Sequence, residues 1–171
     1  IFLEDFLQTS GAQNIYLIAH SMGNRGLTGA LSDIITENPA AASKITEIIL
    51  AAPDIDAAIF KKDIVPVLAK IKKPVTLYTS SNDWALKASQ IFSEYPRAGQ
   101  GGNLMNTLSG IETIDASRLP STDFFGHSYF SGSPDVLSDI FRIIQKGERP
   151  NKRARLRTVV IDGQTSWEFM N

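Results

Sequence analysis

The sequence predicts an α/β fold, in which a parallel sheet has flanking helices. Short apolar runs rich in β-branched residues alternate along the chain with longer segments whose apolar residues recur at helical spacing. The short runs are apolar along their whole length, which is typical of parallel strands covered on both faces. The chain has 171 residues, 43% of them hydrophobic, and a net charge of −1. It is therefore long enough to bury a core and too apolar to be disordered.

The apolar residues at the start of the chain recur at helical spacing, so the first predicted element is a helix. Apolar runs between turn signals predict strands at residues 15–19, 45–52, 74–79 and 111–115. Helical periodicity predicts helices over residues 27–35, 57–72, 84–95 and 134–144. The first of these stops at Asn38-Pro39, and Pro66 must kink or split the second.

The composition excludes several kinds of site and partner. The absence of cysteine excludes disulfides, thiol catalysis and cysteine-ligated metals, and only two histidines are present. We therefore expect no metal and no cofactor. Apolar runs stay far below the roughly 18 residues of a membrane span, so no span is expected in this segment.

The C-terminal residues differ from the rest in charge. We assign residues 1–145 to a partial domain and residues 146–171 to a basic tail, either part of that domain or loosely attached. Between residues 146 and 157, six basic side chains face one acidic side chain, Glu148, a net of +5. Aromatic residues do not interleave with these charges, so we interpret them as solvated or locally paired and predict no nucleic-acid partner.

The strongest motif is Ala19-His20-Ser21-Met22-Gly23, directly between the first strand and the first helix. It matches the nucleophile elbow G-x-S-x-G, with the small Ala19 in place of the first glycine. In this interpretation Gly23 lets the helix approach the strand closely. The turn projects the Ser21 hydroxyl from the carboxyl end of the sheet and aims the Met22 N–H at a developing oxyanion.

His20 should point away from the Ser21 hydroxyl, as a structural or pocket-lining residue. The simpler alternative is a serine that caps an ordinary helix.

A serine nucleophile needs a base and an acid. His127 remains for the base, in the loop between the last strand and the last helix. Asp83 follows the third strand and is the preferred acid, which would fix the histidine tautomer. Its alternative role is the N-cap of the helix that starts at Trp84. The other candidate acids are Asp54, Asp56, Asp115 and Asp123.

Five segments together resemble the α/β-hydrolase superfamily, and more closely a bacterial esterase/lipase-like branch of largely unassigned function. They are IYLIAHSMGN, EIILAAPDID, PVTLYTSSNDWAL, IETIDAS and FGHSYF. The resemblance spans about residues 2–168, since Arg153, Leu156 and Trp167-Glu168 look like the ending of that branch. It implies a triad of Ser21 as nucleophile, Asp83 as acid and His127 as base, in the chain order of α/β hydrolases.

Strands one to four of such a fold, and the loop that supplies the second oxyanion donor, have no counterpart in this sequence. We therefore expect strands five to eight of the usual eight, the C-terminal part of a longer hydrolase. The missing N-terminal half of the same protein is then an expected partner, and the strand that carries Ser21 is expected to be an exposed edge. Loss of one oxyanion donor typically costs about 10²–10³ in kcat, so we expect the full-length parent to be the active form.

The predicted function is a serine hydrolase that cleaves a small-molecule carboxylic ester through an acyl-enzyme. Thioester or amide cleavage would use the same residues. A hypothesis from another class is a hydrolase-fold domain kept for binding or assembly, without turnover. A nucleic-acid binder ranks behind both.

Overall fold

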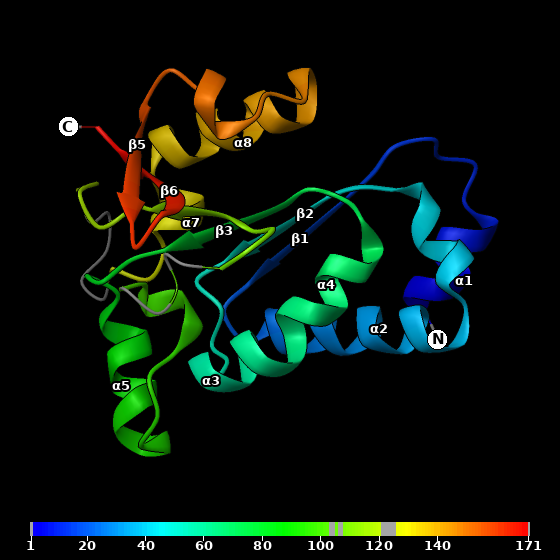
Figure 1. Cartoon of the computed structure of the whole chain (residues 1–171), viewed down its shortest axis with the longest axis horizontal. Coiled ribbons are helices and arrows are strands. Elements are labelled where there is room, and N and C mark those ends of the chain that lie inside the picture. Colours follow the sequence, from blue (N-terminus) through cyan, green and yellow to red (C-terminus); the bar gives the residue numbers. More distant parts are fainter. Residues whose placement is uncertain (1, 103–104, 106–107, 121–125, 171) are drawn as a thin grey trace.

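The computed structural model describes residues 2–102, 105, 108–120 and 126–170, which form a sheet with helices on both faces (Figure 1). The six-stranded sheet has the order β1-β2-β3-β4-β6-β5. Its strands are β1 (Ile15–His20), β2 (Ile45–Ala51), β3 (Val75–Thr79), β4 (Glu112–Asp115), β5 (Leu156–Ile161) and β6 (Gln164–Phe169). β5 runs antiparallel to β6, and all other pairings are parallel. The predicted α/β class and parallel sheet are confirmed.

The helices lie close to their predicted positions. They are α1 (Phe2–Thr9), α2 (Gly23–Glu37), α3 (Ala57–Ile59), α4 (Val65–Ile71), α5 (Trp84–Ser93), α7 (Tyr129–Gly132) and α8 (Pro134–Lys146), with short 3₁₀ helices at Pro39–Lys44, Ala98–Gln100 and Pro150–Lys152. Pro66 splits its segment as predicted: a π-helical turn, Phe60–Ile64, separates α3 from α4, and Pro66 lies in the first turn of α4. None of the helices in the described part of the chain combines the length and apolarity needed to cross a membrane.

The sheet separates two hydrophobic cores. α1, α2 and α4 lie on one side, and α7 and α8 lie on the other (Figure 1). Successive residues of β2 point to opposite faces, so Ile48 and Leu50 join the first core and Ile49 joins the second. Both faces of the central strands are thus covered, and their continuous apolar runs follow from this arrangement.

β1 differs from the central strands because it is an edge strand with β2 on one side only, as the sequence analysis predicted for the strand before Ser21. Its coverage is also incomplete: Ile18 is 42% exposed. The expectation that every strand is covered on both faces is therefore wrong for β1. Tyr16 and His20 share the face of Ile18 by strand alternation and point toward the side of α7 and α8.

The C-terminal residues, assigned from the sequence to a basic tail, supply the last two strands of the sheet. Residues 156–169 form the β5–β6 hairpin, and β6 pairs with β4 through Ile114 and Trp167. The turn residues Asp162 and Gly163 have φ of 51° and 74°. Positive φ at both central residues is typical of the type I′ hairpin turn, for which Asp-Gly is a strong signal. The strands were missed because half of the β5 residues are exposed and its continuous apolar run, residues 159–161, is only three residues long.

Three arginines of this segment pair with acidic residues of the sheet and α8, as the locally paired interpretation expected. The pairs are Arg149 with Glu47 at 2.7 Å, Arg153 with Asp139 at 2.9 Å, and Arg157 with Glu168.

Candidate active site

Ser21 lies in a strained turn between β1 and α2. Its φ is 53°, a left-handed conformation that is uncommon for residues other than glycine. Hydrogen bonds to both backbone groups hold it there. Ser21 N donates to Ala51 O at 3.0 Å, and Ser21 O accepts from Asn24 Nδ2 at 2.9 Å and from Asp54 N at 3.3 Å. Such over-determined strain at the end of a strand is the geometry predicted for a nucleophile elbow.

The Met22 N–H lies at the N-terminus of α2, directly after Ser21. A helix leaves its first four N–H groups without intrahelical acceptors. Here Asn24 N donates to Ser21 O at 3.1 Å, and Arg25 N donates to Met22 O at 3.0 Å. The Met22 side chain is 65% exposed, so the start of the helix is accessible. This position suits a donor to negative charge, because the helix dipole is positive at this end.

Gly23 has more space around it than the motif predicted. A Cβ at this position would meet no heavy atom within 4 Å outside its chain neighbours and its own helix. The predicted close approach of helix and strand at Gly23 is therefore wrong, because the residue faces open space at the start of α2. Ala19 is 9% exposed and fits the small position before the turn.

His127 and Asp83 lie side by side, although 44 residues separate them in the chain. His127 Nδ1 is 2.7 Å from Asp83 Oδ2. A carboxylate only accepts hydrogen bonds, so Nδ1 carries the proton and Nε2 is the basic nitrogen. Asp83 is fully buried, whereas the His127 side chain is 20% exposed and so remains accessible. Asp83 Oδ1 also accepts from Leu86 N at 3.0 Å, so the aspartate caps α5 as well.

His20 makes a contact that sequence reasoning did not predict. Its Nε2 lies 3.2 Å from His127 O, and the two imidazole rings are 4.6 Å apart. Phe130 stacks against the His20 ring, with centroids 5.6 Å apart. Burial lowers the pKa of His20 and the charge of the neighbouring His127 lowers it further, while the hydrogen bond to the His127 carbonyl and the charge of Asp83 act in the opposite direction. Strand alternation could have indicated the face of His20, but not that His127 contacts it.

The other candidate acids are engaged elsewhere or lie outside the described residues. Asp54 forms ion pairs with Arg25 at 3.0 Å and Arg97 at 3.1 Å, Asp56 caps α3, and Asp115 accepts from Ser117. Asp123 lies outside the described residues. Among the candidate acids that the structure describes, Asp83 is the one in contact with His127.

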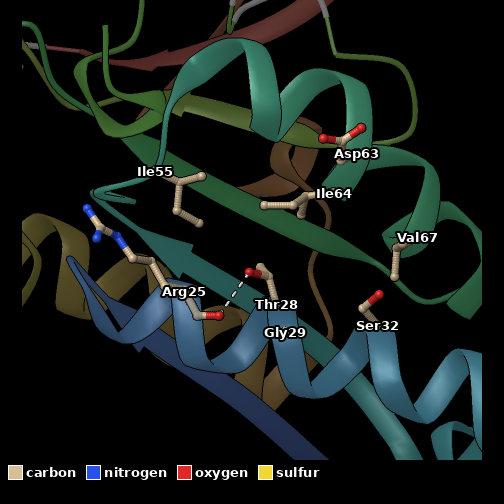
Figure 2. A pocket seen from close by; sticks show the side chains of 8 residues that line it. All are labelled: Arg25, Thr28, Gly29, Ser32, Ile55, Asp63, Ile64 and Val67. Carbon is tan, nitrogen blue, oxygen red and sulfur yellow. Dashed lines mark hydrogen bonds between the residues drawn. The ribbon is translucent and has the colours of Figure 1, made fainter. Parts of the chain in front are cut away.

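A separate groove of about 290 Å³ lies between α2 and the segment that contains the π-helical turn Phe60–Ile64 and α4 (Figure 2). Figure 2 shows Arg25, Thr28, Gly29 and Ser32 of α2 on one side, and Ile64 and Val67 on the other. Its lining residues include no histidine, and the guanidinium of Arg25 is paired with Asp54. The paired side chains of His127 and Asp83 do not line this groove. Across the described chain, no three histidine, aspartate or glutamate side chains gather as a metal site would require.

The mostly parallel sheet, the helices on both faces and the strained serine turn after β1 define the class of α/β hydrolases. Within this class, the chain belongs to the family described as alpha/beta hydrolase of unknown function (DUF900), whose model matches residues 2–146. No curated protein and no solved structure matches the chain. The family match ends in the last turn of α8, so the β5–β6 hairpin lies beyond the matched residues.

Proposed function

We propose that this protein is a serine hydrolase of carboxylic esters, with Ser21 as nucleophile, His127 as general base and Asp83 as the acid that orients it. The observation that carries the proposal is the 2.7 Å contact between His127 Nδ1 and Asp83 Oδ2. The strained backbone of Ser21 supports it, because that conformation exposes a nucleophile at the sheet edge. The contact between His20 and His127 supports it further, since His20 immediately precedes Ser21.

In the proposed reaction, His127 Nε2 takes the proton of Ser21 Oγ as the oxygen attacks the ester carbonyl. Asp83 stabilises the imidazolium, and the Met22 N–H donates to the oxyanion. The imidazolium then protonates the leaving alcohol, and an acyl-enzyme remains on Ser21. A water molecule, deprotonated by His127, attacks this ester and releases the carboxylic acid, which restores Ser21.

Turnover of matched ester, thioester and amide substrates identifies which carbonyl compound the protein prefers. Thioesters and amides present the same carbonyl to the same three side chains, and esters have a better leaving group than amides. We expect turnover of p-nitrophenyl acetate to exceed that of the matching anilide. Parallel assays with an acyl thioester then separate esterase from thioesterase activity.

The test is covalent labelling with a fluorophosphonate probe, located by peptide mass spectrometry. We expect label on Ser21, its loss in Ser21→Ala, and a fall of about 10³-fold or more in ester turnover. Ser43→Ala is the control, because Ser43 is an exposed serine in the 3₁₀ helix Pro39–Lys44. A folded protein that takes no label and turns over no ester would belong to the non-catalytic class. Unchanged turnover in Ser21→Ala would also overturn the proposal.

A further inference from the structure

We propose that His20 is a positioning residue for the base: it fastens the loop of His127 to the strand that carries the nucleophile. This inference rests on the proposed function and adds a residue that the triad alone does not include. It concerns the distance between Ser21 and His127, which belong to separate elements.

The bond between His20 and His127 joins the two elements directly. His20 is the last residue of β1 and pairs in register with Ala51, so the sheet holds its backbone. Its Nε2 is 3.2 Å from His127 O. A carbonyl oxygen only accepts, so Nε2 carries the proton and donates. The base loop is thereby tied to the residue immediately before Ser21.

Two further contacts among the described residues connect this loop to β3 and the turn that follows it. Asp83, beyond the end of β3, holds the ring through Nδ1. Tyr129, two residues after His127, is buried and donates its hydroxyl to Tyr78 O at 3.1 Å. These contacts hold the imidazole and the loop against β3. The bond from His20 ties the same loop directly to β1, next to Ser21.

The environment of His20 suits a neutral hydrogen-bond donor. Phe130 stacks on its ring with an interplanar angle of 13°, which limits rotation of the imidazole. Burial lowers the pKa of His20 and the charge of the nearby His127 lowers it further, whereas the hydrogen bond to the His127 carbonyl and the charge of Asp83 raise it; the net shift is downward, which favours the neutral ring. A neutral donor can hold the His127 carbonyl without placing a positive charge beside the imidazolium that forms during catalysis.

Two substitutions of His20 separate its donor from its ring. His20→Gln keeps an N–H donor at a similar reach, whereas His20→Phe keeps an aromatic ring and removes the donor. We expect kcat for p-nitrophenyl acetate to fall about ten- to a hundredfold in His20→Phe, with KM little changed, because the base is misplaced. His20→Gln should stay within about fivefold of the original kcat.

Tyr16→Phe is the matched control. Tyr16 lies on the same strand and face, and its hydroxyl also donates to a carbonyl, Ile144 O at 3.0 Å, but toward α8 rather than the base loop. We expect its kcat to be unchanged. Wild-type kcat in a folded His20→Phe, equal losses in both His20 variants, or a change in KM alone would each overturn the inference.

The tautomers of the two histidines can be measured on the unmutated protein, so this test does not depend on whether a variant folds. The chain has only two histidines, so ¹⁵N-histidine NMR spectra resolve their tautomers individually. We expect the Nε2–H tautomer for His20 and the Nδ1–H tautomer for His127. The Nδ1–H tautomer at His20 would overturn the inference. Absence of label on Ser21 would instead signal failure of the proposed function itself.

Discussion

The two carboxylate oxygens of Asp83 have separate partners. Oδ1 accepts from Leu86 N at 3.0 Å and caps α5, and Oδ2 lies 2.7 Å from His127 Nδ1. The capping role and the catalytic role were alternatives when only the sequence was considered. In the folded protein they are compatible, because the cap fixes the carboxylate and leaves its second oxygen facing the histidine.

Asp83→Asn therefore separates the two roles. Asparagine is about as good an N-cap as aspartate, so we expect the free energy of unfolding to change by less than about 0.5 kcal/mol. The amide nitrogen donates rather than accepts, which favours the wrong tautomer of His127. We expect kcat to fall by about 10³–10⁴. Ester kinetics and urea denaturation measure the two effects.

The comparison variant is Asp83→Ala, which removes both roles. It should lose as much activity and, in addition, about 1 kcal/mol of stability. If Asp83→Asn keeps wild-type kcat, Asp83 has no part in catalysis and its contact with His127 is structural.

The positions of Ser21, Asp83 and His127 could be predicted because each follows a strand, and the carboxyl ends of parallel strands meet at one edge of a sheet. The contact of Asp83 with His127 agrees with that prediction. The role of His20 could not be predicted in the same way. Its side-chain direction follows from strand alternation, but its partner depends on the path of the base loop, which local sequence does not determine.

At the scale of elements, the strands and helices with strong periodicity were predicted to within a few residues. Pro66 split its helix because it lacks the N–H and its ring clashes within a continuous helix. The β5–β6 hairpin was missed for a physical reason. It is an exposed antiparallel ribbon at the sheet edge, where the driving force comes from pairing with β4 and from the Asp162-Gly163 turn rather than from a fully apolar run.

Gly29 of α2 has room for a side chain. Gly29 lies in the helix interior and on the groove of Figure 2, and an added Cβ would meet no heavy atom within 4 Å. Alanine has a higher helix propensity, so Gly29→Ala should raise the free energy of unfolding by about 0.5–1 kcal/mol. Urea denaturation checks this value.

Gly99→Ala is the opposite case and serves as the control. Its Cβ would lie 2.4 Å from the backbone carbon of Ala52. We expect this variant to lose more than about 1 kcal/mol, because the backbone must shift to make room. Equal effects of the two substitutions would contradict the assignment of open space to Gly29.

At the scale of the whole molecule, buried polar contacts join the C-terminal segment to the sheet. The fully buried Arg153 pairs with Asp139 of α8 at 2.9 Å, and Asp139 accepts from Tyr78 OH of β3 at 2.6 Å. Burial raises the pKa of Asp139, and Arg153 opposes that shift. This series of polar contacts, from Arg153 through Asp139 to Tyr78, links residues beyond α8 to the centre of the sheet. Titration of the Tyr78 hydroxyl should therefore affect the stability of the entire fold.

Alkaline pH should therefore destabilise the protein. Burial raises the pKa of Tyr78 and Tyr129 well above 10.0, and neighbouring carboxylates, Asp139 and Asp83, raise it further. Above about pH 10 the unfolded chain releases these protons while the folded protein retains them. Stability is then full below the unfolded pKa and falls as pH rises toward the folded pKa, by about 1.4 kcal/mol per pH unit for each tyrosine.

Urea denaturation at several alkaline pH values measures this slope, and Tyr129→Phe should remove about half of it. This variant suits the test because Tyr78 O, which accepts from Tyr129 OH, also accepts from Ala52 N at 3.0 Å and so stays paired. Stability near neutral pH should change little. A wild-type free energy of unfolding that stays constant above about pH 10 would mean that both phenols titrate alike in the folded and unfolded chain, and an identical slope in both proteins would mean this for Tyr129.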